Sequence, residues 1–228
     1  MLEVCVQSDA ELVLAQSAGA QRVELCSRLE VGGLTPTIEM VQRCLDVATV
    51  PIVVLVRSRD GNFCFDPNDQ TEMMLQVKEI SRLGVNGIVA GGLTHDGEID
   101  QSFVAALRGV CTSCELVFHR AFDEIVDKER AVDRLVKLGV DRILTSGGVG
   151  DACQYLSTLA SLRKYTVGKI ELLPAGGIRS SNATRLLEET GCSQLHASFR
   201  LSDSGGNSGP DSEEIKRTRA IMNSLAQD

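Results

Sequence analysis

The sequence contains one short pattern four times, and this repeat strongly restricts the folds open to the chain. Each copy has a glycine, an apolar or small residue, two further residues and an apolar run; the copies are GAQRVELC, GVNGIVAG, GVDRILTS and GCSQLHAS, beginning at residues 19, 84, 139 and 191. Each glycine follows an amphipathic segment, and glycine readily adopts the left-handed conformation that ends a helix. The short apolar runs that follow are typical of strands. Each copy therefore predicts a helix end followed by a strand.

The intervals between the copies are too long for one strand–helix unit and fit two. Additional strands are predicted at residues 2–6, 51–56, 115–119 and 169–174, and helices at 9–18, 37–48, 68–83, 100–110, 127–138, 152–165, 181–190 and 211–226. Eight strands alternating with eight helices indicate either an open doubly wound sheet or a closed barrel, and the repeat favours a single (β/α)8 TIM barrel over residues 1–228. The Gly/Ser-rich segment 201–210 is predicted to be a mobile loop.

Composition excludes several classes of function. Hydrophobic residues make up 43% of the chain and Trp is absent, so the core must be largely aliphatic, which suits parallel strands buried on both faces. The net charge of −8 with no basic cluster argues against nucleic acid as a partner, and no apolar run is long enough to cross a bilayer. The amino terminus lacks the features of a signal peptide, so we expect a cytoplasmic protein whose eight cysteines are reduced.

Side chains alternate across a strand, and the aligned repeats predict which of them face the barrel axis. The predicted inward residues occupy successive layers; they are Arg22, Gly87, Arg142 and Gln194, then Glu24, Val89, Leu144 and His196, then Cys26, Gly91, Ser146 and Ser198 at the carboxyl end. On the first strand the same alternation turns Glu3 and Cys5 inward. Because buried charges are costly unless paired, Glu3, Glu24, Arg22 and Arg142 are expected to form ion pairs.

Barrel enzymes place their chemistry at the carboxyl ends of the strands, and ionisable residues are concentrated there in this sequence. His119, Asp123 and His196 are candidate catalytic residues, with the two histidines as general acid and base. Arg57, Arg59 and Arg179 could hold an anion. The rim therefore suggests an enzyme that acts on a small anionic or phosphorylated metabolite in a solvent-filled pocket. No strong motif specifies the reaction.

Several motifs resemble signatures of the CutC family. They are EVCV at 3–6, RVELCS at 22–27, GGLTP at 32–36, the Arg-x-Arg-x-Gly-x-Phe-Cys segment at 57–64, FHRAFD at 118–123, DRILTSG at 141–147, GGIR at 176–179 and HASF at 196–199. The resemblance implies a (β/α)8 barrel that self-associates into a homo-oligomer. It also implies a role in copper homeostasis, as the family name proposes.

Cys5 and Cys26 are the candidate metal ligands. They are predicted near the ends of neighbouring strands, which lie about 4.8 Å apart in a sheet, and both face inward. Two thiolates suit Cu(I), a soft ion, and the resemblance adds that the copper site proposed for the family involves these two cysteines. The alternative is that both are small buried hydrophobic residues. Copper binding and enzymatic action on an anion are the two functions that the sequence leaves open.

Overall fold

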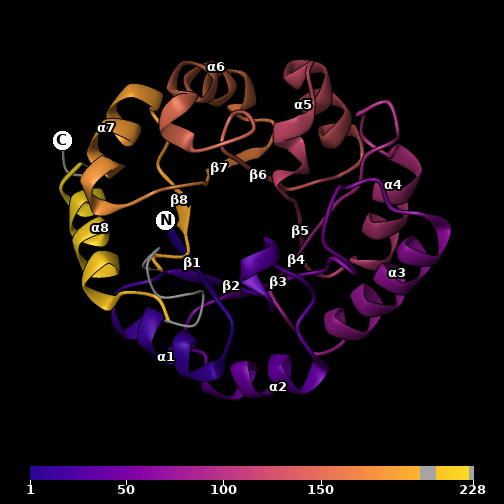
Figure 1. Cartoon of the computed structure of the whole chain (residues 1–228), viewed down its shortest axis with the longest axis horizontal. Coiled ribbons are helices and arrows are strands. Elements are labelled where there is room, and N and C mark those ends of the chain that lie inside the picture. Colours follow the sequence, from indigo (N-terminus) through magenta and orange to yellow (C-terminus); the bar gives the residue numbers. More distant parts are fainter. Residues whose placement is uncertain (201–208, 226–228) are drawn as a thin grey trace.

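The computed structural model describes residues 1–200 and 209–225, and most of the loop predicted at 201–210 lies outside the described residues. Its eight strands form one parallel sheet in the order β7-β6-β5-β4-β3-β2-β1-β8. The strands are β1 (Leu2–Val6), β2 (Arg22–Leu25), β3 (Ile52–Leu55), β4 (Gly87–Ala90), β5 (Glu115–Phe118), β6 (Arg142–Thr145), β7 (Glu171–Pro174) and β8 (Leu195–Ala197). The two end strands of this order, β7 and β8, also contact each other, so the barrel is nearly closed (Figure 1).

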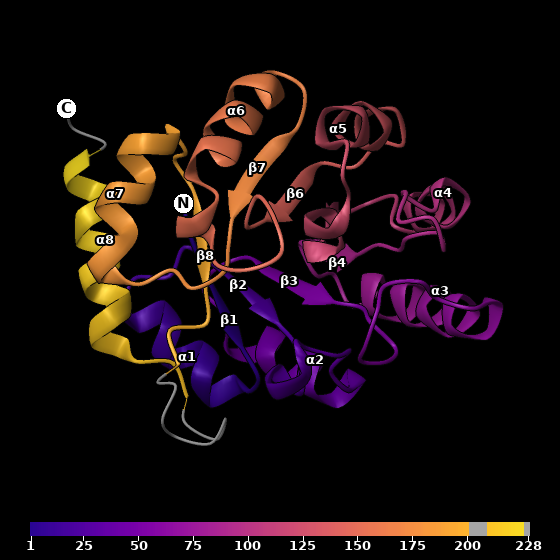
Figure 2. The same cartoon turned by 45° about the horizontal axis from the view of Figure 1, so that its top comes forward.

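The described part of the chain has eight α-helices. They surround the strands (Figures 1 and 2). They are α1 (Asp9–Ser17), α2 (Ile38–Val47), α3 (Pro67–Ser81), α4 (Gln101–Val110), α5 (Lys128–Lys137), α6 (Leu156–Thr166), α7 (Ser180–Thr190) and α8 (Ser212–Leu225). Helix α8 contacts both α7 and α1 and thereby completes the outer ring. The predicted (β/α)8 barrel is confirmed. Within the described residues, no helix has both the length and the apolar character needed to span a membrane.

The predicted alternation of side chains is also confirmed. Val4, Val23 and Ile143 belong to the core between the strands and the helices, where each is fully buried. A second, smaller apolar cluster fills the barrel interior; it consists of Cys5, Cys26, Val53, Leu55, Val89, Val117, Leu144, Leu173 and Ala175. The thiols therefore lie inside the barrel, as expected.

Ion pairs fill the end of the barrel at which the strands begin. Arg22 pairs with Glu3 and also with Glu115, and Arg142 pairs with Glu115 at 2.6 Å. The expectation of ion pairs is thus confirmed for Glu3, Arg22 and Arg142, although Glu115, which joins the two arginines, was not among the predicted partners. Glu24, the fourth residue expected to be paired, lies 3.4 Å from His196 instead. This end of the barrel is occupied by protein side chains.

The expectation of eight reduced cysteines is wrong for one pair. Cys111 and Cys114 form a disulfide, and the other six cysteines are free. Cys111 caps the end of α4, and the turn after it brings its Cα to 5.8 Å from that of Cys114, within the range of about 4.4–6.8 Å usual for a disulfide. None of the cysteines inside the barrel takes part in this bond.

Candidate functional site

A cavity of about 270 Å³ opens at the carboxyl ends of the strands. Its chemically active lining residues come from six different strands or the loops that follow them; they are Cys5, Glu24, Cys26, Arg57, His119, Arg120, Arg179 and His196. Parallel strands that close into a barrel bring their carboxyl ends onto one rim, which explains why residues so distant in sequence converge. The predicted pocket is therefore present.

The two candidate copper ligands lie side by side in this cavity. The Sγ atoms of Cys5 and Cys26 are 3.3 Å apart, and both side chains are buried. The hydrogen bond with Cys26, burial, and the charges of Cys26, Glu24 and Glu3 raise the pKa of the Cys5 thiol well above its ordinary value. Both cysteines are free thiols.

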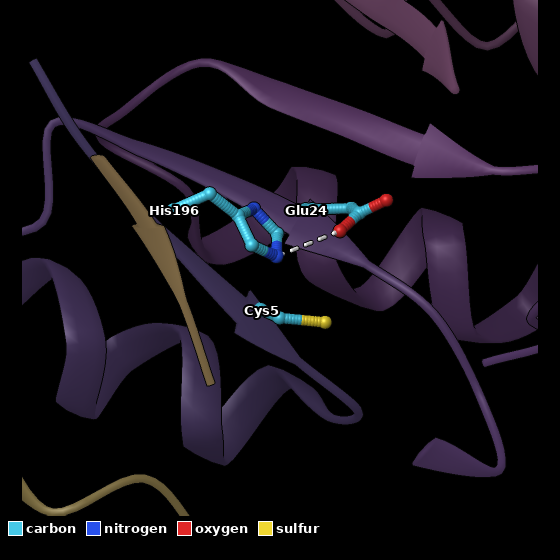
Figure 3. Close-up of side chains that lie close together, drawn as sticks. All are labelled: Cys5, Glu24 and His196. Carbon is cyan, nitrogen blue, oxygen red and sulfur yellow. Dashed lines mark ion pairs between the residues drawn. The ribbon is translucent and has the colours of Figure 1, made fainter. Parts of the chain in front are cut away.

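An imidazole and a carboxylate accompany the thiols. One ligand atom from each of Cys5, Glu24 and His196 lies within 4.8 Å of the others, and Figure 3 shows these side chains converging from β1, β2 and β8. The register of β1 and β2 places Cys5 opposite Glu24. The alternation of side chains predicted that Glu24 faces inward, but Glu24 was not predicted as a site residue. Its expected position beside Cys5 could have identified it as one.

A hydrogen bond and an ion pair fix the orientation of His196. Its Nδ1 lies 2.6 Å from Glu3 Oε1. Its Nε2 lies 3.4 Å from Glu24 Oε2, and Figure 3 marks this pair with a dashed line. Burial alone would lower the pKa of His196, but the hydrogen bond to Glu3 and the charges of Glu24 and Glu3 raise it. Burial likewise raises the pKa of Glu24 to about 7, against the opposing charge of His196.

Asp123, a predicted catalytic residue, does not line the cavity. Its carboxylate accepts hydrogen bonds from Thr145 Oγ1 at 2.5 Å and Ser146 Oγ at 2.6 Å, and it pairs with Arg120 Nε at 2.9 Å. Asp123 therefore holds the Arg120 guanidinium, and Arg120 lines the cavity in its place.

The structure brings together four of the six candidate catalytic and anion-binding residues predicted at the rim. Arg57, His119, Arg179 and His196 line the cavity, whereas Arg59 is not among the lining residues. Arg59 Nε pairs with Asp69 Oδ2 at 2.7 Å. Asp69 lies in the first turn of α3, outside the barrel mouth, and this ion pair turns Arg59 away from the cavity.

Comparisons with known proteins agree on one family. The model of the CutC family matches residues 1–201. A CutC family protein of Vibrio atlanticus is 38% identical over 86% of this chain and 81% of its own length, and the human copper homeostasis protein cutC homolog is 35% identical over 90% and 76%.

Solved structures give the same assignment. The crystal structure of CutC from Streptococcus agalactiae, a proposed copper homeostasis protein, has a TM-score of 0.82 and 30% identity over 86% of this chain and 97% of its own. Phosphoribosyl anthranilate isomerase of Thermotoga maritima has a TM-score of 0.65 over 98% of each chain at 14% identity. That second likeness concerns the barrel fold alone.

Proposed function

The chain belongs to the CutC family, and we propose that it serves copper homeostasis by binding Cu(I) through the thiolates of Cys5 and Cys26. The single observation that carries this proposal is the 3.3 Å approach of the two Sγ atoms inside a cavity. The curated relatives named for copper homeostasis support it. A cytoplasmic location is a further part of the proposal and is supported by the six free cysteines, since thiols stay reduced in the cytosol. Self-association is another part and rests on the family resemblance.

The donor set fits a soft monovalent ion. Thiolate and imidazole are suitable ligands for Cu(I), whereas Mg²⁺ and Ca²⁺ take oxygen ligands. Metal–thiolate bonds of about 2.3 Å, as found for zinc, would place two trigonally arranged sulfurs about 4 Å apart, so the thiols need to separate only slightly.

His196 is the proposed third ligand through Nε2. Its Nδ1 is held by Glu3, an arrangement in which a carboxylate orients a metal-binding imidazole from behind. Ligand atoms of Cys5, Glu24 and His196 lie within 4.8 Å of one another, whereas Cys26 is not part of this cluster, so the imidazole would reach an ion from the Cys5 side. Glu3 therefore orients His196, and its charge also raises the pKa of the Cys5 thiol.

A competition titration with a chromogenic Cu(I) chelator under anaerobic conditions tests the proposal. We expect Cys26→Ser and Cys5→Ser each to weaken Cu(I) binding by a factor on the order of 100, since loss of even an outer partner of a metal ligand costs about 10–100-fold. Cys44→Ser is the matched control, because Cys44 is a free, fully buried cysteine on α2. The proposal fails if the double variant of Cys5 and Cys26 binds Cu(I) as tightly as the Cys44→Ser protein.

A second candidate function is catalysis on a small anionic metabolite. The observation that favours it is Glu24, which lies 3.4 Å from His196 and whose pKa of about 7 suits proton transfer with that imidazole. Arg57 and Arg179 would hold the anion. Native mass spectrometry of the copper-free protein tests this candidate: a bound anionic metabolite that is lost in Arg57→Gln supports it, and an empty cavity in freshly purified protein counts against it.

A further inference from the structure

The cavity has two chemically different sides. The thiols, Glu24 and His196 come from β8, β1 and β2, whereas Arg57, His119 and Arg179 follow β3, β5 and β7. Among the described residues that line the cavity, Glu24 is the only acidic one, and it lies on the thiol side. The side from β3 to β7 is therefore cationic and lacks a carboxylate of its own.

On this side, the ring of His119 has its hydrogen-bond donor at Nε2. The backbone N–H of Ala121 donates to His119 Nδ1 at 3.3 Å, so Nδ1 carries no proton and the neutral ring must carry its proton on Nε2. Burial and the nearby charge of Arg57 lower the pKa of His119 to about 3, which keeps the ring neutral. Nε2 is buried and has no hydrogen-bond partner among the described residues.

Arg57 presents a second unused donor. Its Nη1 donates to the carbonyl oxygens of Val31 and Gly33, each at 3.1 Å, and its Nη2 donates to that of Gly61 at 2.7 Å. These bonds fix the guanidinium, yet its Nε is buried and has no partner within the described part of the chain. The residue is only 4% exposed and forms no ion pair with a described carboxylate.

The ring of Phe63 links the two groups. The centroid of its ring lies 4.8 Å from the centroid of the His119 ring and 5.0 Å from the guanidinium carbon of Arg57. Phe63 also lines the cavity. A buried cation without an ion-pair partner and a buried N–H without an acceptor are both costly, so their presence around one aromatic ring points to a ligand.

We infer that the β3–β7 side of the cavity is a binding subsite for a small carboxylate, which accepts hydrogen bonds from His119 Nε2 and Arg57 Nε. Two N–H donors match the two oxygens of a carboxylate. The guanidinium groups of Arg179 and Arg120, which also line the cavity, already donate to Arg200 O, Ser146 Oγ and Gly150 O. The volume of about 270 Å³ is close to the lower end of ligand pockets, about 300 Å³, and suits a molecule of a few heavy atoms. The subsite specifies the ligand class of the second candidate function, catalysis on a small anionic metabolite. Binding of a carboxylate does not depend on that function, and only a reaction after binding would rest on it.

Titration of copper-free protein with pyruvate, a Cu(I) chelator being present throughout, tests the subsite. In protein labelled with ¹⁵N-histidine, the Nε2–H signal of His119 should move on addition of pyruvate, and pyruvamide, its neutral amide, should leave it in place. Arg57→Gln and His119→Phe should each weaken pyruvate binding at least tenfold. Arg59→Gln is the matched control, since Arg59 is a neighbouring arginine engaged by Asp69 outside the cavity, and should change the affinity less than twofold.

Arg57 also donates hydrogen bonds to the carbonyl oxygens of Val31 and Gly61, so its replacement could impair folding. The ¹⁵N signal is measured on the parent protein and therefore tests the subsite without the variants. The subsite is refuted if pyruvate leaves the Nε2–H signal unmoved, or if pyruvamide moves it equally. Tighter binding of inorganic phosphate than of pyruvate at this signal would refute the commitment to a carboxylate. Since copper is excluded, failure here does not affect the copper proposal, and loss of copper binding in the cysteine variants does not affect the subsite.

Discussion

His119 should make the stability of the protein fall as the pH falls from 7 to 5. Burial and the charge of Arg57 lower the pKa of this residue to about 3 in the folded protein, whereas an unfolded histidine titrates near 6.5. Below pH 6.5 the unfolded state therefore binds a proton that the folded state excludes. The free energy of unfolding decreases by about 1.4 kcal/mol per pH unit once that difference is complete. Integrated from pH 7 to pH 5, this amounts to about 2 kcal/mol.

The variant His119→Gln isolates this effect. Glutamine does not titrate, and its side-chain oxygen can accept the Ala121 N–H that His119 now caps. Any packing loss shifts the stability equally at all pH values, whereas the titration changes it with pH. Urea unfolding of both proteins at half-unit intervals from pH 7 to pH 5 gives the two profiles. The difference between parent and variant should change by about 2 kcal/mol across this range, to the disadvantage of the parent.

Parallel profiles would refute the reasoning. If the difference stays constant within about 0.5 kcal/mol, His119 titrates in the folded protein much as it does when unfolded. In that case the ring is open to protonation, and its Nε2–H is not the fixed neutral donor on which the carboxylate subsite depends.

Two further predictions concern other parts of the barrel. Glu3→Gln should lower the free energy of unfolding by about 3–5 kcal/mol, because it removes the buried partner of Arg22 and His196. The control is Glu189→Gln, in an exposed pair with Arg185, which should change the free energy of unfolding by less than about 1 kcal/mol. An equally small loss for Glu3→Gln would contradict the buried network. Thiol titration of the denatured, unreduced protein should find six free thiols, and eight would contradict the Cys111–Cys114 disulfide. In the Cys111→Ser variant, the number of thiols found without reductant should equal the number found with it.

The fold could be predicted from the sequence because its evidence is periodic. The glycine before each of four strands marks a helix end, and all four have positive φ; they are Gly19, Gly84, Gly139 and Gly191. Alternation then assigned Cys5 and Cys26 to the barrel interior, since the direction of a strand side chain depends only on its parity. The cavity and most of its lining follow from the same two rules.

The features that the sequence could not predict lie in the loops and in the electrostatics. The Arg59 side chain leaves the cavity because Asp69 pairs with it, a contact between a loop and the start of a helix that no periodicity encodes. Asp123 is likewise drawn to Thr145 and Ser146, on the neighbouring strand and just beyond it. The neutrality of His119 depends on burial and on Arg57, and neither can be read from spacing. All three features depend on which side chains meet in the folded protein, whereas the sequence repeat indicates only the order of strands and helices.

The distribution of charge in the cavity bears on how its two proposed ligands relate. A cation is favoured on the side of β8, β1 and β2, where Glu24 and Glu3 lie behind the thiols and His196. An anion is favoured on the side that carries Arg57 and Arg179, because the described lining there has no acidic residue. In a buried cavity of low dielectric constant, opposite charges on the two ligands attract each other more strongly than in water. A carboxylate bound at His119 and Arg57 should therefore strengthen Cu(I) binding at the thiols, and by thermodynamic linkage Cu(I) should strengthen carboxylate binding by the same factor.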